Sequence, residues 1–310
     1  MKKEIQLKFK LEYNIDPKKS GFYSQILRFP ELLESYRNNG EFAYVDRAVI
    51  EEFGWKIHIS SSLFDIENVI EKTFDVLTKY NSSFKILKSI DLYKFTSSKK
   101  VSRTSYGKLI TIYPESYHQF KELLDELYIK LRNYKGPYIL SDRRYKDSKC
   151  IYYRFGTNIG KYFNNDGSIL RKYFYKNKEY IDTVNPYFEL PEFVKDEINF
   201  NIEDSEIFNK KLKVLRAIQF SNTGGTYVAI YKPKNIKSIV KEARAYTALD
   251  NKVDSIKYRK HEKKLLIRLK DMSYIPNYID DFETFDNYYL ITEFIDGHTL
   301  TEYVQKNNPI

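Results

Sequence analysis

The hexapeptide WKIHIS at residues 55–60 alternates apolar and polar side chains. A strand places successive side chains on opposite faces, so its three apolar residues share one face and its three polar residues share the other. The apolar face predicts contact with a hydrophobic core. The opposite face then carries Lys56 and His58 side by side, which makes this strand the natural centre of a candidate site.

Further strands and helices surround this segment in the sequence. The apolar spacing of residues 63–77 predicts a helix that Ser61 or Ser62 caps, and that of residues 120–131 predicts a second helix. Strands are predicted at 84–87, 108–113, 138–140 and 150–155. This arrangement predicts an α+β domain with a mixed, mainly antiparallel sheet and flanking helices.

The pattern changes between Asp182 and about Ser205, where prolines and an acidic stretch interrupt the periodicity. A new order begins after this junction: strand, glycine-containing turn, strand, short strand, helix and strand pair. We therefore expect two domains, residues 1–205 and residues 206–310. The second pattern predicts a five-stranded sheet with one main helix.

Composition narrows the classes of function. The chain has 52 Lys and Arg against 42 Asp and Glu, and the resulting charge of +10 is spread along its length. Such a balance favours phosphates or acidic peptides, and the lack of a clustered basic block ranks nucleic-acid binding last. The single cysteine, Cys150, excludes an internal disulfide and a cysteine-based zinc site. Without a long apolar run, the sequence predicts a cytoplasmic protein with no membrane span.

Basic residues recur on or beside the strands of the first domain, and several can converge on one positively charged surface. Removal of phosphate from phosphoserine or phosphothreonine by β-elimination needs a base, an acid and cations that neutralise the departing dianion. A lysine among other cations can serve as the base, and a histidine can serve as the acid. Residue types at this spacing do not specify the reaction, since a His beside a Lys on a strand is usually a surface residue.

Several blocks of the first domain, in their order and separation, resemble one family. The blocks are GWKIHIS at 54–60, FK at 84–85, GKLITIYP at 107–114, GPYILSDRR at 136–144 and YYRFG at 152–156. They resemble the N-terminal lyase domain of class III and class IV lanthipeptide synthetases, which is itself similar to phosphothreonine lyases that some bacterial pathogens secrete. The resemblance covers roughly residues 1 to 200.

The resemblance implies a role for each matching residue. His58 matches the general acid and Lys85 the general base, and the lyase needs no metal and no cofactor. The implied phosphate-binding residues are Lys56, Arg103, Lys108, Arg143, Arg144 and Arg154. Asp142 would orient one of these cations, although a structural ion pair is an equally weighted alternative for Asp142 and Arg143. The implied partner is a ribosomally made precursor peptide, dehydrated to dehydroalanine or dehydrobutyrine.

The second domain carries another set of motifs. Gly224 and Gly225 stand between strand-like flanks, which is typical of either a nucleotide-phosphate loop or a plain hairpin turn. Lys241, Glu262 and Glu293 lie in stretches that resemble the third strand, the αC helix and the hinge of lanthipeptide synthetase kinase domains. The resemblance implies a protein-kinase-like N-lobe that, in the full-length kinase, binds ATP or GTP with magnesium.

Neither a His-Arg-Asp-type loop nor an Asp-Phe-Gly-type motif occurs in the 310 residues. Those segments supply the catalytic Asp and the metal ligands of kinases. We therefore expect a lyase domain joined to an incomplete kinase-like lobe that lacks phosphotransfer activity, from a longer enzyme that also carries a cyclase domain. The alternative is a non-catalytic scaffold that binds the leader segment of the precursor peptide.

Overall fold

The computed structural model describes residues 28–97, 106–159, 162–163, 169–185, 187–198, 203–250, 253–298 and 300–308. The chain divides into two compact units. The first runs to residue 202 and includes the short segments 221–223 and 244–254, and the second holds the remaining residues. The boundary predicted after residue 205 falls inside helix α7 (Glu203–Lys211).

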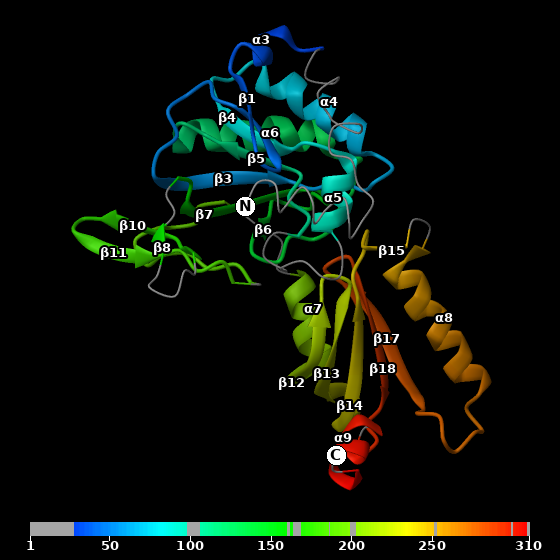
Figure 1. Cartoon of the computed structure of the whole chain (residues 1–310). Helices are drawn as coiled ribbons and strands as arrows, with labels where there is room; N and C mark the ends of the chain where they lie inside the picture. Colours follow the sequence, from blue (N-terminus) through cyan, green and yellow to red (C-terminus); the bar gives the residue numbers. More distant parts are fainter. Residues whose placement is uncertain are drawn as a thin grey trace. The chain divides into compact units, whose positions relative to one another are not determined.

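A seven-stranded sheet forms the centre of the first unit (Figure 1). Its strands are β1 (Tyr36–Asn39), β2 (Phe42–Val45), β3 (Phe53–Ile59), β4 (Ser83–Leu87), β5 (Ile110–Tyr113), β6 (Arg143–Arg144) and β7 (Ile151–Thr157). Their order is β1-β2-β4-β5-β3-β7-β6, and each neighbouring pair is antiparallel. Together with the helices below, this sheet confirms the predicted α+β class, mainly antiparallel with flanking helices.

Helices of the first unit cover one face of this sheet (Figure 1). The two long helices are α4 (Ile66–Leu77) and α6 (Tyr117–Leu131). The unit also has two shorter helices, α3 (Pro30–Leu33) and α5 (Ile90–Thr96). Trp55 of β3 stacks on Phe120 of α6 with ring centroids 5.0 Å apart, and Ile57 is fully buried. The alternation of β3 therefore turns its apolar residues towards the helices, as predicted, and leaves Lys56 and His58 on the opposite face.

Two local predictions in this unit are wrong. The first helix was predicted to start at residue 63, but α4 begins only after Asp65; the Ser62 hydroxyl accepts the backbone N–H of Asp65 at 3.2 Å, as a capping serine does, and donates to the Asp65 carboxylate at 2.7 Å. Residues 138–140 form no strand. They follow Pro137, which lacks an N–H donor for a ladder, and Tyr138 instead packs edge-on against Tyr152.

A hairpin of β10 (Lys172–Tyr175) and β11 (Lys178–Ile181) packs beside β3. Its two turn residues have φ angles of 48° and 63°, the left-handed geometry of a two-residue type I′ turn. Tyr173 stacks on Phe53 of β3 with ring centroids 4.5 Å apart. Aromatic packing therefore holds the hairpin against the main sheet. Two shorter strands, β8 (Tyr162–Phe163) and β9 (Ile169–Leu170), pair with each other.

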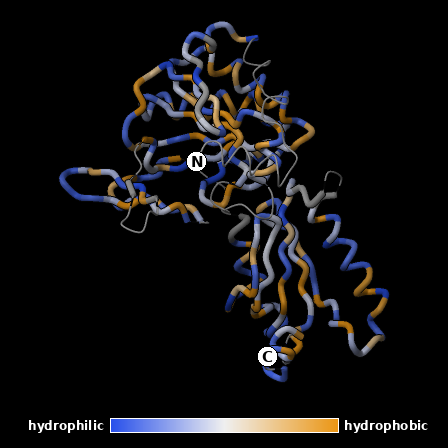
Figure 2. The backbone as a smooth tube through the Cα atoms, in the orientation of Figure 1, coloured by the Kyte–Doolittle hydropathy of each residue, from blue (hydrophilic) through white to orange (hydrophobic). Residues whose placement is uncertain are grey.

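The second unit is built on a five-stranded sheet of order β12-β13-β14-β18-β17. Its elements are α7, β12 (Leu212–Ser221), β13 (Gly224–Tyr231), η1 (Lys232–Lys234), β14 (Ile236–Ala243), α8 (Ser255–Arg268), β17 (Tyr278–Thr284), β18 (Asn287–Glu293) and α9 (Leu300–Asn307). A short pair, β15 (Ala248–Asp250) and β16 (Val253–Asp254), precedes α8 in the sequence but belongs to the first unit. Helix α8 packs against β14, β17 and β18. Figure 2 shows α8 as largely hydrophilic with interspersed hydrophobic residues, as expected for a helix that covers a sheet with one side.

Candidate active site

The sheet register brings Lys85 into the same transverse row as His58. His58 of β3 lies directly opposite Thr111 of β5, and Lys85 of β4 lies opposite the same threonine. Directly opposite residues of antiparallel strands point to the same face. Lys85 and His58 therefore flank Thr111 on the face away from α4 and α6. Two interstrand spacings, about 10 Å, separate their backbones, so both side chains can reach a group that sits over Thr111.

A second pair of cations lies one step along the same face. Lys56 precedes His58 by two residues, so the two side chains share a face. Lys56 is directly opposite Arg154 of β7. The two side chains are buried at 7 % exposure each. Four of the predicted site residues, Lys56, His58, Lys85 and Arg154, are thus brought to one face of one sheet by strand pairing alone.

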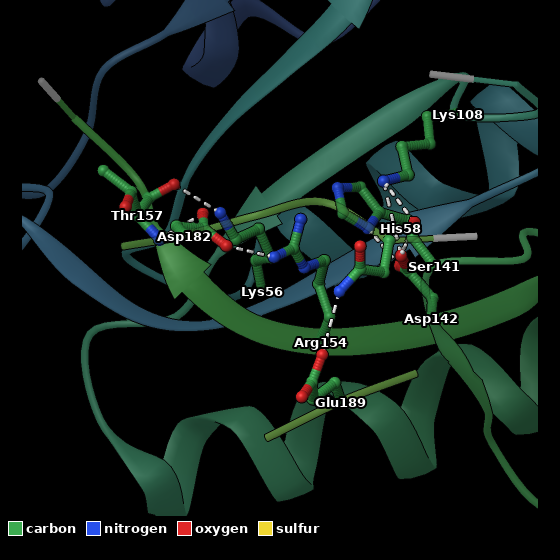
Figure 3. A network of polar contacts seen from close by, with 10 residues as sticks. Lys56, His58, Lys108, Ser141, Asp142, Arg154, Thr157, Asp182 and Glu189 are labelled. Carbon is green, nitrogen blue, oxygen red and sulfur yellow. Dashed lines mark hydrogen bonds and ion pairs between the residues drawn. The ribbon is translucent and has the colours of Figure 1, made fainter. Parts of the chain in front are cut away.

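The carboxylate of Asp142 joins His58 to Lys108 (Figure 3). One carboxylate oxygen pairs with Nδ1 of His58, and the other lies 3.3 Å from Nζ of Lys108. The Ser141 hydroxyl donates to Asp142 at 2.6 Å and accepts from Lys108 at 2.9 Å. Because an ionised carboxylate only accepts hydrogen bonds, Nδ1 carries a proton and Nε2 is left as the reactive nitrogen.

A second buried carboxylate, Asp182, links Arg154 to Lys56 (Figure 3). Asp182 forms an ion pair with the Arg154 guanidinium and accepts a hydrogen bond from the backbone N–H of Thr157 at 2.9 Å. The carbonyl of Thr157 in turn accepts a hydrogen bond from Nζ of Lys56 at 2.6 Å. The two cations are therefore held in place through one carboxylate and one stretch of backbone.

Burial dominates the electrostatics of these groups. It lowers the pKa of His58 to about 3, against the opposing attraction of Asp142. Burial and then the neighbouring Arg154 charge hold the pKa of Lys56 well below its ordinary value, and burial also lowers the pKa of Lys108. Burial alone would raise the pKa of Asp142, but His58 and Lys108 prevail and keep it well below its usual value. The site is crowded with basic groups and would be stabilised by an anion.

Of the other predicted arginines, Arg144 lies on the same face of the sheet as His58. Arg144 of β6 lies opposite Tyr152 of β7, which is itself opposite His58, so Arg144 stands in the same transverse row. Its guanidinium lies 5.4 Å from the ring centroid of Tyr138. Arg103 lies outside the described residues. Arg144 therefore remains a candidate for phosphate binding at the end of the row.

Arg143 points to the other face of the sheet, because it is adjacent to Arg144 in a strand. It forms an ion pair with Asp196, and its guanidinium lies 4.2 Å from the ring centroid of Phe188. Tyr153 donates to the same Asp196 carboxylate at 3.0 Å. The structure thus shows Arg143 in the ion pair that the sequence left open, on the face away from His58, and phosphate binding by this residue stays a prediction.

Sequence reasoning missed three groups of the site: Ser141, Thr157 and Asp182. Ser141 immediately precedes Asp142 in a block that was already singled out, so a signal for it existed. Thr157 contributes only backbone atoms, which no residue type reveals. Asp182 stands in the stretch interpreted as an interdomain junction, and nothing in its spacing connects it to β7.

The residues predicted for nucleotide binding lie in the second unit. Nζ of Lys241, on β14, is 2.6 Å from the Glu262 carboxylate of α8. Gly224 has a φ of +141°, and a Cβ there would lie 2.1 Å from the carbonyl oxygen of Glu242, so only glycine fits. Gly225 follows it at the start of β13. The side chain of Glu293, at the end of β18, accepts hydrogen bonds from Asn277.

The described part of the chain lacks two kinds of feature. No helix there combines the length and the apolar character that crossing a bilayer requires. Across the same described ranges, no three or more His, Cys, Asp and Glu side chains are grouped so that they could hold a metal ion.

Comparison with known proteins identifies the family of the first unit. Residues 36–203 match the family described as RamC, N-terminal domain, which is more than half of the chain. The chain belongs to this family. The matched range includes all seven strands of the main sheet and both buried carboxylates of the site.

A curated relative supports the same relationship. The chain is 27 % identical over 266 residues to the probable SapB synthase of Streptomyces coelicolor. The alignment covers 83 % of this chain and 28 % of that relative. The resemblance to class III lanthipeptide synthetases is thereby confirmed as a distant relationship.

Proposed function

We propose that the first unit is a lyase that eliminates phosphate from phosphoserine or phosphothreonine of a ribosomally made precursor peptide in lanthipeptide biosynthesis. The observation that carries the proposal is the shared row of Lys85 and His58 on either side of Thr111. Membership of the RamC N-terminal domain family supports it. No metal or cofactor takes part in the proposed reaction.

Substrate binding relies on the surplus of positive charge. Lys56 and Arg154 form one cationic pair, and Lys108 and Arg144 flank His58 on the same face. A phosphate dianion entering among these groups relieves their mutual repulsion, and its interaction with Lys56 and Arg154 is strong because these two are buried. Arginine can bind phosphate in fork geometry, whereas lysine acts as a point charge.

Lys85 acts as the base. Its neutral amine removes the α-proton of the phosphorylated residue, and the electron pair left on Cα forms the Cα–Cβ double bond as the Cβ–O bond breaks. The proton stays on Lys85, and phosphate departs with both electrons of the broken bond.

His58 acts as the acid for the leaving phosphate. Before substrate binds, burial keeps its pKa at about 3, so the imidazole is neutral at physiological pH. A phosphate dianion beside Nε2 supplies the opposite charge that favours the imidazolium. Asp142 stabilises that cation from the Nδ1 side. Binding of substrate is therefore coupled to uptake of the proton that His58 later gives to the departing oxygen.

The second unit fits the N-lobe of a protein-kinase-like domain. Its strand order and the Lys241–Glu262 pair of 2.6 Å support that interpretation. In the full-length enzyme, Gly224, Gly225 and Glu293 would approach ATP or GTP, and magnesium would be held by segments that are not among these 310 residues. The elimination reaction makes no use of this unit.

Mass spectrometry of a phosphoserine peptide after incubation with the protein tests the proposal. Elimination leaves dehydroalanine, which an added thiol traps, whereas hydrolysis leaves serine. We expect the thiol adduct from the wild-type chain and none from His58→Ala or Lys85→Ala. A peptide that stays phosphorylated, yet binds, would favour the non-catalytic scaffold instead.

A further inference from the structure

The β10–β11 hairpin fixes the position of Asp182. This residue directly follows β11, and its backbone N–H donates to the carbonyl of Arg171 at 2.7 Å, which closes the base of the β10–β11 hairpin. Aromatic stacking holds that hairpin on β3 through Tyr173 and Phe53. Asp182 is therefore fixed in space by a hairpin that docks on the sheet carrying the candidate site.

The side chain of Asp182 reaches into the site and is only 5 % exposed. It pairs with Arg154 and accepts from the N–H of Thr157, whose carbonyl receives Nζ of Lys56. Each of these contacts constrains a cation that the proposed reaction uses. No other acidic residue among the described contacts touches either cation.

A glycine makes this approach feasible. A Cβ at Gly156 would lie 2.8 Å from both carboxylate oxygens of Asp182 and 2.9 Å from the Arg154 guanidinium. Real Cβ atoms do not come so close to other heavy atoms, so any side chain at this position would push the carboxylate and the guanidinium away. On β7, Arg154 thus provides the cation, and the missing side chain of Gly156 leaves space for the Asp182 carboxylate that pairs with it.

We propose that Asp182 is a positioning residue that aligns Arg154 and, through the backbone of Thr157, Lys56 as a two-point phosphate clamp. The proposal rests on the proposed elimination at this site. Without the carboxylate, the directly opposed Lys56 and Arg154 repel each other across β3 and β7. The β10–β11 hairpin thereby becomes part of the phosphate site, although none of its own strand residues needs to touch substrate.

The Asp182→Asn variant tests this role, because it keeps the shape of the side chain and removes its charge. With a phosphoserine peptide, we expect KM to rise at least about tenfold, as for the loss of one charge-assisted contact, with a smaller change in kcat. Since Asp182 favours the charged form of Lys56, the alkaline rise of KM should also move to lower pH. A merely structural aspartate would leave that pH profile in place.

Two further variants make the test specific. Gly156→Ala displaces the carboxylate without changing any charge and should raise KM as well, which keeps the proposal testable if Asp182→Asn folds poorly. Glu179→Gln, in the same hairpin, removes an exposed carboxylate that pairs with Lys172 at 2.8 Å and should leave KM unchanged. Asp182→Asn should raise KM by a smaller factor in the Arg154→Ala background than in the wild type, because the guanidinium that Asp182 pairs with is already absent.

Binding of inorganic phosphate, measured by calorimetry, separates this inference from the proposed function. If the wild type eliminates nothing but Asp182→Asn still binds phosphate more weakly, the lyase proposal fails and the clamp stands. If the wild type eliminates and a folded Asp182→Asn matches it in KM, pH profile and phosphate affinity, the clamp is overturned and the lyase stands.

Discussion

The two units use ion pairs in different environments. In the first unit, Asp142 and its partner His58 have side-chain exposures of 0 % and 5 %, whereas the Lys241 and Glu262 side chains of the second unit are 27 % and 29 % exposed. Breaking a buried ion pair costs more free energy than breaking an exposed one, because the remaining charged group cannot be solvated by water. The difference shows that the Asp142–His58 pair is shielded from water, while the Lys241–Glu262 pair is accessible to solvent.

The largest expected effect concerns elimination itself. His58→Ala and Lys85→Ala should each lower the rate of phosphate elimination by about 10²–10⁴-fold, the usual contribution of a general acid or base. Release of phosphate from a phosphoserine peptide gives the rate, and the fluorescence of Trp55 reports whether the first unit is still folded.

A matched pair of lysine variants sharpens this prediction. Lys85→Arg keeps the positive charge but removes any neutral amine, so it should be nearly as inactive as Lys85→Ala. Lys56→Arg keeps a phosphate-binding charge and should retain much more activity. The reverse order of activities would transfer the role of base to Lys56, whose lowered pKa also suits a base.

The next effect compares the two units directly. Asp142→Asn removes a buried carboxylate from His58 and Lys108 and should lower the free energy of unfolding of the first unit by about 3–5 kcal/mol. Glu262→Gln removes a partly solvated one and should cost less than about 1 kcal/mol. Urea titrations followed by Trp55 fluorescence and by circular dichroism measure both changes. Equal losses would show that burial does not distinguish the two ion pairs.

Acid should destabilise the first unit through His58. Its folded-state pKa of about 3 lies below its ordinary value of 6.5, so the unfolded state binds the proton more readily. Stability is therefore lost as pH falls from 6.5 towards 3, by on the order of 1–2 kcal/mol between about pH 7 and 5. His58→Asn should flatten this part of the curve, whereas His118→Asn, at an exposed position on α6, should not.

The smallest expected effect falls on Arg143. Because it faces away from His58, Arg143→Ala should change the elimination rate less than about twofold while lowering stability by about 1 kcal/mol through loss of its pair with Asp196. Arg144→Ala, one residue later but in the row of His58, should weaken phosphopeptide binding instead. Similar KM values for the two variants would contradict the face assignment.

Part of the fold follows from sequence periodicity. The alternation in residues 55–60 predicted which face of β3 is buried, and the spacing of apolar residues predicted helices α4 and α6. A strand was wrongly predicted at residues 138–140, because a short apolar run is typical of a strand. Pro137 and the packing of Tyr138 instead favour a loop there. The helix predicted over residues 63–77 was placed too early, because α4 starts only after Asp65, whose backbone N–H donates to the Ser62 hydroxyl.

The site was less predictable than the fold, for topological reasons. Lys56 and His58 share a strand, so their common face is a local property. Lys85 joins them only because β5 inserts between β4 and β3, and strand order is not written in the spacing of residues; the family resemblance supplied this pairing. Arg143 and Arg144 sit in a strand of two residues, too short for periodicity to choose a face.

Long-range contacts account for what was missed. Asp182 is distant in sequence from Lys56 and from Arg154, and its approach depends on the docking of a hairpin and on the absence of a side chain at Gly156. Neither condition has a local signature. A buried carboxylate that holds a cation need not lie in the same sequence motif as that cation, so the motif does not reveal it.

Oxygen isotope analysis of the released phosphate tests the central claim most directly. The protein is incubated with a phosphoserine peptide in water enriched in ¹⁸O, and the phosphate and peptide are analysed by mass spectrometry. Elimination breaks the Cβ–O bond, so we predict phosphate without solvent oxygen, together with a dehydroalanine peptide. Phosphate that carries one solvent oxygen, with a serine peptide, would show hydrolysis at phosphorus and contradict the roles given to Lys85 and His58.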